Sequence, residues 1–430
     1  MFENARRFRR SFRVARTGGR IYLGYKRTQR RVRKLPPEAA AAEWDTQHTR
    51  AAEGLYRLAI DLKGLYIKSG QFIGTRSDIV PAPYAKSLSR LQDSVPPRPV
   101  AEVRSTIEHE FGAPLEQLFA TFDETPLAAA SLAQVHRATL ADGREVVVKV
   151  QYPEVGALVR LDIRNLRTLV GIVARREPNF DYRAIVNEIG SQIPLELDFV
   201  REAEMTRRVR ANLAALPEIT VPKVVDGLVS GRVLVTEYIH GARLLDNARL
   251  AAMDIDRSRL AQTIAGAYGH QILVDGLFQA DPHPGNILVL AGGGVALLDF
   301  GLTKELPEEF RLGFARLVIA ASERDPVGIL SAFAELGVKT KSDDPAGVLG
   351  LTQVFFDTRS ASQGPAGVGA TVQATRRNPV EAIPGDLVLL GRVVGLLRGV
   401  CATLGTPLSP MQMLRPYAER ALAEERRAVS

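Results

Sequence analysis

The chain has 430 residues, of which 46% are hydrophobic and 24% are charged, and its formal net charge is +8. These values are ordinary for a soluble globular protein, and the length is sufficient for two or three subdomains around a full core. The single cysteine, Cys401, excludes an internal disulfide framework and a cysteine-based metal site, and it is typical of a reducing compartment.

The excess positive charge is concentrated in residues 1–34, which contain thirteen Arg or Lys residues and one acid, Glu3. Aromatic residues such as Phe8, Phe12 and Tyr22 are interleaved with these charges. Such a segment can lie on an anionic membrane surface, bind nucleic acid, act as a transit peptide, or form a solvated and frayed tail. We favour the membrane surface, with the tail as the main alternative. Because no apolar h-region or small-residue cleavage site follows, we do not expect secretion.

Residues 38–75 carry apolar side chains at near-helical spacing, and they predict one amphipathic helix. Near its end, Lys68 and Gln71 are three residues apart and therefore share a helix face. A cation and an amide placed in this way can reach a phosphate or a carboxylate, although spacing alone favours a solvated face. Residues 98–122 predict two short helices that are broken at Gly112-Ala113-Pro114.

A hairpin is predicted around Asp142-Gly143, which separates two runs rich in β-formers. Its second strand carries Lys149 between two valines, an unusual place for a surface lysine, and we interpret Lys149 as a phosphate ligand. Kinases precede such a lysine with a G-x-G-x-x-G-x-V loop, whose three glycine positions are alanines here. Because alanine resists positive φ and close approach to phosphate, this loop should be stiffer and hold nucleotide differently. Its predicted nucleotide contacts are Ala128, Ala129, Ala130, Ser131, Ala133 and Val135.

The helical pattern of residues 153–193 is broken near Glu177-Pro178-Asn179, which predicts one or two helices inserted after the hairpin. The next helix is predicted to begin at Pro194 and to continue to Ala214. Three acids lie near its start, namely Glu196, Asp198 and Glu202. An acid on this helix is the candidate partner that orients the strand lysine.

A further hairpin is predicted from the two β-rich runs 221–226 and 232–241, with its turn at Ser230-Gly231. The backbone from Glu237 to Ile239, which leaves the second strand, suits a hinge between two lobes. Backbone amides there can pair with the edge of an adenine ring.

The stretch 279–302 contains two apolar runs joined by a glycine turn, which predicts a hairpin between Asn286 and Asp299. An amide oxygen and a carboxylate that converge at one end of a hairpin can hold Mg²⁺, which prefers oxygen ligands. Asp281, five residues before Asn286, is expected to stand beside them as a base. His283 is expected to brace this loop by hydrogen bonds and not to bind metal.

Further helices are predicted at residues 256–275, 308–336 and 410–430, and residues 340–383 are predicted to form a helix plus a flexible loop. The most apolar stretch, residues 387–404, is interrupted by Arg392 and Arg398. Each charge near a bilayer centre costs about 2.5–3.5 kcal/mol on insertion scales. We therefore interpret this stretch as a buried helix and not as a membrane span.

In this order and spacing, the motifs resemble those of the atypical kinase family called ABC1, ADCK or UbiB. Members of that family belong to the protein-kinase-like superfamily and are connected with coenzyme Q and isoprenoid-quinone biology. The matching pieces are K-x-G-Q at Lys68 to Gln71, A-A-A-S-x-A-Q-V-H at Ala128 to His136, the strand lysine Lys149, E-x-D at Glu196 and Asp198, DPHPGN at Asp281 to Asn286, and DFG at Asp299 to Gly301. The resemblance covers roughly residues 50–405, and it is highly specific.

The resemblance implies an α+β, two-lobed protein-kinase-like fold with a helical N-terminal extension and a helical insertion in the N-lobe. The expected parts are a basic segment (1–37), a helical K-x-G-Q extension (38–125), an N-lobe (126–240, with the insertion at about 153–193) and a helical C-lobe (241–430). In the family, the K-x-G-Q helices fold over the active site. Lys68 and Gln71 would then face Asp299, Glu196 and the nucleotide.

The resemblance also implies roles for the remaining motif residues. Glu202 matches the glutamate that pairs with Lys149, and Glu196, with Asp198 in the same motif, matches the glutamate that contacts the extension. Asn286 and Asp299 match the metal ligands. Asp281 occupies the position of the catalytic aspartate.

From these motifs we expect ATP and Mg²⁺ as ligands of an atypical kinase or ATPase in isoprenoid-quinone lipid metabolism. An isoprenoid lipid or quinone precursor and an anionic membrane surface are the expected partners, nucleic acid is not, and a homodimer is left open. The expected location is cytoplasmic and peripheral to the membrane, or organellar in a eukaryote. One alternative is a non-catalytic, nucleotide-dependent lipid-binding or scaffold protein. A weaker alternative is a conventional protein or small-molecule kinase.

Overall fold

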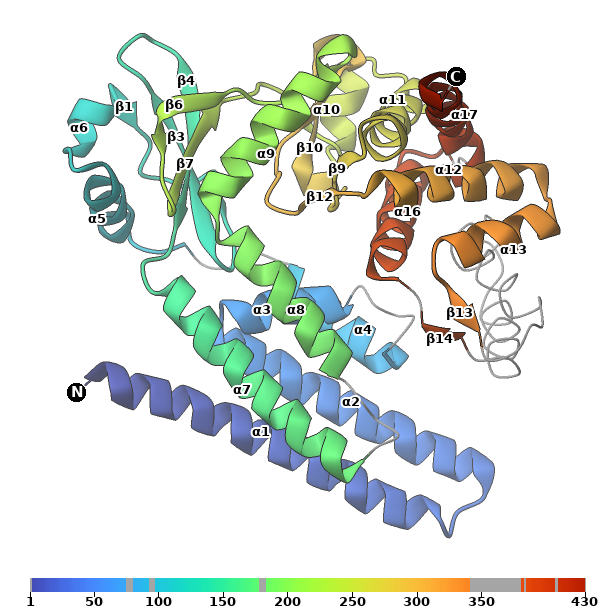
Figure 1. Cartoon of the computed structure of the whole chain (residues 1–430). Coiled ribbons are helices and arrows are strands. Elements are labelled where there is room, and N and C mark those ends of the chain that lie inside the picture. The colour runs from blue at the N-terminus through green and yellow to red at the C-terminus, as the bar shows by residue number, and fades with distance from the viewer. Residues whose placement is uncertain are drawn as a thin grey trace. The chain divides into compact units, whose positions relative to one another are not determined.

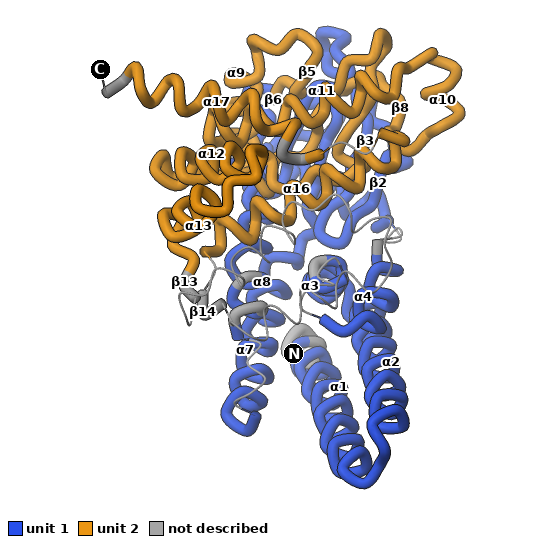
Figure 2. Tube along the Cα trace, turned by 90° about the vertical axis from the view of Figure 1, so that its right-hand side faces the viewer, with its two compact units in different colours: residues 1–201, 225–237 blue, residues 202–224, 238–430 orange. Residues whose placement is uncertain are grey.

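The computed structural model describes residues 2–74, 80–92, 97–177, 183–340, 380–382, 384–406 and 409–429. The chain forms two compact units, coloured separately in Figure 2. Unit 1 consists of residues 1–201 and 225–237, and unit 2 consists of residues 202–224 and 238–430. The chain passes from unit 1 to unit 2 for the last time between Glu237 and Tyr238. This boundary lies within the segment predicted to be a hinge.

Unit 1 opens with a group of helices that lie side by side in Figure 1. They are α1 (Phe2–Val32), α2 (Pro37–Leu62), α3 (Leu65–Gly74), α4 (Ala82–Leu88) and the 3₁₀ turn η1 (Ser89–Gln92). The prediction of a single helix over residues 38–75 is wrong. The chain breaks at Lys63 and Gly64, which both have a φ of 55°, a value that a right-handed helix cannot contain.

The basic helix α1 packs against α2 and against α7 (Val155–Arg176), as Figure 1 shows. Arg10, Val14 and Thr28 on α1 are buried, because each faces this helical packing. The alternative of a frayed, solvated tail is therefore wrong for this segment. The opposite face of α1 is exposed and carries most of its arginines together with Phe8 and Phe12.

Unit 1 also contains a six-stranded sheet, in the order β1-β3-β4-β7-β6 with β2 paired to β3. The strands are β1 (Thr121–Phe122), β2 (Ala128–Ala129), β3 (Ala133–Thr139), β4 (Glu145–Gln151), β6 (Val224–Val229) and β7 (Val233–Glu237). Both predicted hairpins of this region are confirmed. In β4, Val146, Val148 and Val150 are buried against α5 (Val100–Phe111) and α6 (Leu115–Leu118). Because side chains alternate along a strand, Lys149 lies on the other face of the sheet.

The predicted helical insertion is confirmed as α7 and α8 (Arg183–Glu196). The predicted start of the next helix is wrong, because Pro194 lies inside α8 and α9 begins at Phe199 (Phe199–Asn212). The carboxylate of Asp198 accepts a hydrogen bond from the backbone N–H of Arg201 at 3.0 Å, which caps the first turn of α9. The residue that marks the start of α9 is therefore Asp198, whereas the prediction relied on Pro194.

Unit 2 contains a four-stranded sheet in the order β5-β11-β10-β8 and a separate antiparallel pair, β9 with β12. The strands are β5 (Ile219–Thr220), β8 (Ala242–Arg243), β9 (Leu277–Gln279), β10 (Ile287–Val289), β11 (Val295–Leu297) and β12 (Thr303–Glu305). The helices include α10 (Asn247–Ala252), α11 (Arg257–Gly269), α12 (Glu308–Glu323), α13 (Pro326–Glu335), α16 (Gly385–Thr403) and α17 (Pro410–Val429). Their apolar faces and the strands share one large core.

Two predicted helices of unit 2 differ in detail from the structure. The helix expected over residues 256–275 ends as a π-helix, His270–Asp275, directly after α11. The helix expected over residues 308–336 is two helices, because Arg324 has a φ of 57° and Asp325 caps α13. Most of residues 340–383, for which a helix and a flexible loop were predicted, lies outside the described residues; the structure describes a short strand pair there, β13 (Lys339–Thr340) with β14 (Val380–Ala382).

The apolar helix α16 has its leucines and valines in the core of unit 2, as predicted for a buried helix. Among the described residues, none of the helices combines the length and the apolarity that crossing a membrane requires.

Candidate active site

The loop from Asp281 to Asn286 and the DFG segment are held together at both ends in unit 2. At one end β9 pairs with β12, and the backbone N–H of Ala280 donates to the carbonyl of Leu302 at 2.8 Å. At the other end β10 pairs with β11, and the N–H of Leu298 donates to the carbonyl of Asn286 at 3.0 Å. Asn286 therefore lies next to Asp299, as the predicted hairpin requires.

Asp281 and Asn286 are joined directly. The amide nitrogen of Asn286 donates to the carbonyl of Asp281 at 3.1 Å. Because the nitrogen makes this bond, the amide oxygen of Asn286 is the atom that can face a cation. His283 braces the same loop by accepting the N–H of Gly285 at Nδ1, 3.1 Å away, so its predicted role is confirmed.

Asp299 is fixed by the glycine that follows Phe300. Its Oδ1 accepts the N–H of Gly301 at 3.0 Å. A Cβ added at Gly301 would lie 3.3 Å from this oxygen and 3.4 Å from Oε2 of Glu202, so only glycine fits between the two carboxylates without a shift. Glu202 is buried beside the DFG segment within unit 2. Lys149 belongs to unit 1, and its pairing with Glu202 stays a prediction.

Asn286 and Asp299 fit a magnesium ion by the chemistry of their oxygens. Over the described ranges, no three His, Cys, Asp or Glu side chains converge as a metal cluster. Mg²⁺ does not need such a cluster, because it retains waters and is commonly held by one or two protein oxygens and the phosphates of its substrate. The donor set therefore suits a metal that arrives with a nucleotide.

In unit 1, Lys149 stands opposite Val135 in β3 and Leu234 in β7. Its ammonium lies 5.1 Å from the centre of the Phe199 ring, a cation–π distance. The ring belongs to the first turn of α9, the helix that Asp198 of the E-x-D segment caps. Ala128 and Ala129 form β2, which pairs with β3. Ala128 stands opposite Val135, and Ala129 stands opposite Gln134.

The K-x-G-Q helix makes two contacts inside unit 1. The ammonium of Lys68 lies 2.8 Å from Oε2 of Glu196, an ion pair in which both side chains are partly buried. The amide nitrogen of Gln71 donates to the carbonyl of Leu91 at 2.8 Å. The first contact is the one that the family resemblance implies for Glu196. The predicted approach of Lys68 and Gln71 to Asp299 involves the other unit and stays a prediction.

The predicted hinge leaves β7 at Glu237 and continues without regular structure through Ile239 to Gly241. A Cβ at Gly241 would lie 2.9 Å from Cβ of Leu288 and 3.0 Å from the carbonyl oxygen of Val289. Only glycine permits this close approach, which lets β8 pair with β10 directly after the segment. Pairing of an adenine with Glu237 or Ile239 stays a prediction.

Comparison with known proteins decides the family. Residues 90–333, more than half of the chain, match the ABC1 atypical kinase-like domain. The chain belongs to the ABC1 atypical kinase-like family.

Among the similar ABC1-type relatives is the AarF domain-containing protein kinase 1 of Mus musculus, which is 34% identical over 88% of this chain and 75% of its own length. The protein ACTIVITY OF BC1 COMPLEX KINASE 8, chloroplastic, of Arabidopsis thaliana is 37% identical over 69% of this chain and 40% of its own length. A solved structure of Rv3197 with erythromycin, from Mycobacterium tuberculosis, has a TM-score of 0.60 and 24% identity over 88% of this chain and 97% of that one. The match to the ABC1 atypical kinase-like domain and this structural likeness together confirm the predicted kinase-like fold.

Sequence reasoning missed Arg392, which was interpreted only as an interruption of an apolar stretch. From α16 its guanidinium reaches Oδ1 of Asp281 at 3.3 Å, and both side chains are partly buried. The pair places a positive charge beside Asp281, the predicted catalytic aspartate. A charged residue inside an otherwise apolar helix was the signal, because a buried arginine requires an acid partner.

Gln279 was also missed, although it replaces the first residue of the usual His-Arg-Asp triplet. It is fully buried, and its amide nitrogen donates to the carbonyl of Asp299. The hydroxyl of Tyr268 donates to its amide oxygen, which fixes the amide orientation. Gln271, on the π-helix, accepts the backbone N–H of Gln279 at 3.1 Å. This buried network joins Gln279, just before the loop that begins at Asp281, to Asp299, the predicted metal ligand.

Replacing Tyr268 by Phe is expected to lower the free energy of unfolding by about 1–3 kcal/mol, because the amide oxygen of Gln279 would remain buried without its donor. Gln279→Met should cost more, since both the Tyr268 hydroxyl and the Asp299 carbonyl would lose their partner. Urea unfolding of both variants measures these differences. Stabilities equal to that of the wild type would show that the network is not a structural link.

Proposed function

We propose that the chain binds ATP with Mg²⁺ and acts as an atypical kinase or ATPase. Lys149 would hold the α- and β-phosphates, and Asn286 and Asp299 would hold the metal. The metal held by these two residues would supply positive charge against the negative charge that develops during phosphoryl transfer. Asp281 would orient the attacking hydroxyl or water, with its carboxylate positioned by Arg392.

One observation carries this proposal. Asp281, Asn286 and Asp299 are separated by up to 18 positions in sequence, yet two hydrogen bonds bring their segments together: the side-chain amide of Asn286 donates to the carbonyl of Asp281, and the backbone N–H of Leu298 donates to the carbonyl of Asn286. A structural loop has no need for two acids and an amide at such a junction. Oxygen ligands and a positioned base are what phosphoryl transfer requires, since its catalysis is mostly positioning and charge stabilisation.

We further propose that the enzyme works at an anionic membrane surface through α1. Phe8 and Phe12 are 72% and 58% exposed, and their rings stack on one another. Exposed arginines surround them along the same helix, namely Arg7, Arg9, Arg13, Arg16, Arg20 and Arg27. Aromatic residues that insert at the acyl boundary and cations that meet anionic headgroups are the two components of interfacial binding.

The substrate class rests on the family resemblance, which favours an isoprenoid lipid or quinone precursor. In this proposal the phosphoryl chemistry drives extraction or presentation of that lipid at the membrane surface. Among the relatives, the name of the Arabidopsis protein, a kinase connected with BC1 complex activity in the chloroplast, is consistent with a role near quinone chemistry.

ATP hydrolysis with Mg²⁺ tests both the proposed turnover and the proposed membrane role. It is measured under three conditions: with anionic vesicles of phosphatidylglycerol, with neutral vesicles of phosphatidylcholine, and without lipid. We expect turnover in the wild type and stimulation by the anionic vesicles only. The double variant Phe8→Ser, Phe12→Ser should keep basal turnover and lose the stimulation, because the insertion of the two rings is removed while every arginine remains. Equal turnover in all three conditions would contradict the membrane role, and absence of turnover with nucleotide still bound would favour a scaffold.

A further inference from the structure

The helix that precedes β9 ends in one π turn, His270–Asp275, which follows α11 directly. In a π-helix the backbone bonds join residues five apart, so the side chains at the two ends of such a turn lie above one another. In an α-helix, residues five apart are separated by about 140° around the axis, because each residue turns the chain by about 100°. π turns are rare in proteins, and they occur frequently at functional sites.

His270 and Asp275 are the two end residues of this turn, and their side chains meet. Nε2 of His270 lies 3.5 Å from Oδ1 of Asp275, and the side chains are 7% and 12% exposed. The second carboxylate oxygen, Oδ2, is buried and makes no hydrogen bond to any described residue. Because the two residues are five apart, their contact forms in the π register and is lost in an α register.

Tyr417 of α17 also contacts the His270 ring. The ring centres are 6.3 Å apart and the planes meet at 83°, which is an edge-to-face arrangement. A Cβ added at Gly269 would lie 2.4 Å from Cδ2 of Tyr417, so the glycine before the π turn lets α17 approach this closely. The imidazole is therefore packed on one side chain and paired with another.

The far end of the turn is fixed independently of the His270–Asp275 contact. Gly276, with a φ of 68°, ends the turn, and its carbonyl accepts the backbone N–H of Leu306 at 2.8 Å. The guanidinium of Arg311 on α12 donates to the carbonyl of Leu273 at 2.7 Å. With this end held, the register of the turn decides how Gln271, near its start, is rotated relative to β9.

Gln271 is the side chain that depends on this register. Its amide oxygen accepts the backbone N–H of Gln279 at 3.1 Å, and its amide nitrogen donates to the carbonyl of Ala267 at 3.2 Å. Gln279 in turn donates to the carbonyl of Asp299. An α register would rotate Gln271 by about 100° relative to β9 and take its amide oxygen away from Gln279.

From this geometry, and resting on the proposed active site, we propose that His270 and Asp275 are positioning residues for phosphoryl transfer. Their contact stabilises the π register, and the π register places Gln271 at the N–H of Gln279. Gln279 then holds the backbone of Asp299, the proposed metal ligand. The pair acts only through this chain of bonds, since neither side chain belongs to the proposed metal site.

The test is Asp275→Leu, which removes the acid and keeps a side chain of similar size. An apolar side chain in place of a buried charge is commonly tolerated, so the midpoint of urea unfolding should stay close to that of the wild type. The kcat of Mg-ATP hydrolysis is expected to fall about tenfold, because a small misplacement of a reacting group is costly, while the KM for ATP changes less than about twofold. Asp275→Glu retains an acid five residues from His270 and should recover most of the lost kcat.

Amide hydrogen exchange without nucleotide or metal reports on the register itself. In Asp275→Leu the N–H of Gln279 should exchange faster than in the wild type, because it loses the amide oxygen of Gln271 as its acceptor. In Asp275→Glu it should exchange as slowly as in the wild type.

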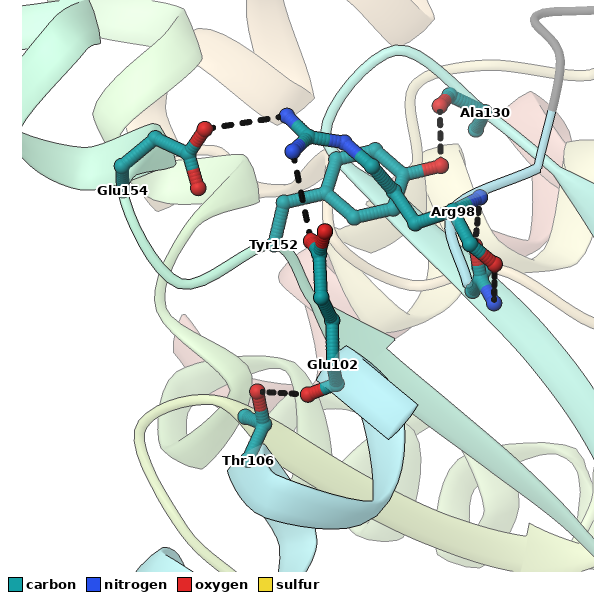
Figure 3. Close-up of polar contacts among 7 residues, drawn as sticks. Arg98, Glu102, Thr106, Ala130, Tyr152 and Glu154 are labelled. Carbon is teal, nitrogen blue, oxygen red and sulfur yellow. Dashed lines mark hydrogen bonds and ion pairs between the residues drawn. The ribbon is translucent and has the colours of Figure 1, made fainter. Parts of the chain in front are cut away.

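The matched control is Glu102→Leu in unit 1, which makes an acid-to-leucine change at another paired side chain. Glu102 pairs with Arg98 at 3.3 Å, and Arg98 retains a second partner in this variant, Glu154 at 3.1 Å (Figure 3). Both the kcat and the exchange of the Gln279 N–H should equal those of the wild type.

An Asp275→Leu variant in which either the kcat or the exchange of Gln279 is unchanged overturns the inference and leaves the proposed function standing. An Asp275→Glu variant that is as impaired as Asp275→Leu overturns it as well. A wild-type chain that turns over no ATP contradicts the proposed function itself, and the positioning role falls with it.

Discussion

Asp299→Asn is expected to reduce Mg²⁺-dependent ATP turnover by at least about 100-fold, since the charge stabilisation from a bound metal is worth several kcal/mol. The substitution keeps an acceptor oxygen for the N–H of Gly301, so the DFG turn should keep its shape. What it removes is the negative charge that would bind the cation in the proposed site. The effect should therefore lie in catalysis and metal affinity and not in stability.

Two measurements separate these contributions. Thermal unfolding with Mg-ATP should show a clear stabilisation of the wild type that is lost in Asp299→Asn, while unfolding without ligand is equal in both. Asp254→Asn makes the same chemical change at an exposed position of unit 2, and it should behave as the wild type. A variant Asp299→Asn that keeps both turnover and stabilisation would exclude Asp299 as the metal ligand.

Arg10→Ala is expected to destabilise unit 1 by about 3–5 kcal/mol, the loss seen when one partner of a buried ion pair is removed. The guanidinium makes two bonds to Asp162, at 2.7 and 2.5 Å, and one to the carbonyl of Leu62, at 2.6 Å. Asp162 is fully buried on α7, and Leu62 ends α2. One side chain of α1 therefore ties the three longest helices of unit 1 together.

The deficit should shrink as the pH is lowered. Burial raises the pKa of Asp162, and the ion pair with Arg10 opposes this rise. Without Arg10 the pKa of Asp162 rises further. Below this raised pKa the carboxyl becomes protonated, and the free-energy cost of burying its unpaired charge disappears. The variant therefore regains stability as the pH falls. The matched control is Arg13→Ala. The ion pair between Arg13 and Asp61, at 3.7 Å, is exposed and should contribute less than about 1 kcal/mol to the free energy of unfolding. Equal, small losses in chemical denaturation of both variants would contradict a structural role for Arg10.

The catalytic half of the fold was predictable because its signals are local. The glycine turn between two apolar runs predicts a hairpin, and a hairpin fixes the neighbourhood of Asn286 and Asp299 whatever surrounds it. Lys149 could likewise be assigned to a strand from its flanking valines. The start of α9 was misplaced because proline is a strong helix-start signal, whereas the capping role of Asp198 depends on the backbone conformation around it.

The contacts between residues that are far apart in the sequence could not be predicted from the sequence pattern. Arg392 and Asp281 are 111 residues apart, and Arg10 and Asp162 are 152 apart. A basic run such as residues 1–34 is interpreted from its total charge, and that total does not reveal that Arg10 points inward. The only signal at Gln279 is its place in the usual His-Arg-Asp triplet, and this signal is weak because a glutamine before a loop has many ordinary uses.

Because the catalytic loop and the DFG segment are bonded at both ends, Phe300 is locked into the core of unit 2, where it is fully buried. Inhibitors that work by driving this phenylalanine out of its pocket would have to break the β9–β12 pairing and the Gln279 network at the same time. Such compounds are poor starting points for this protein.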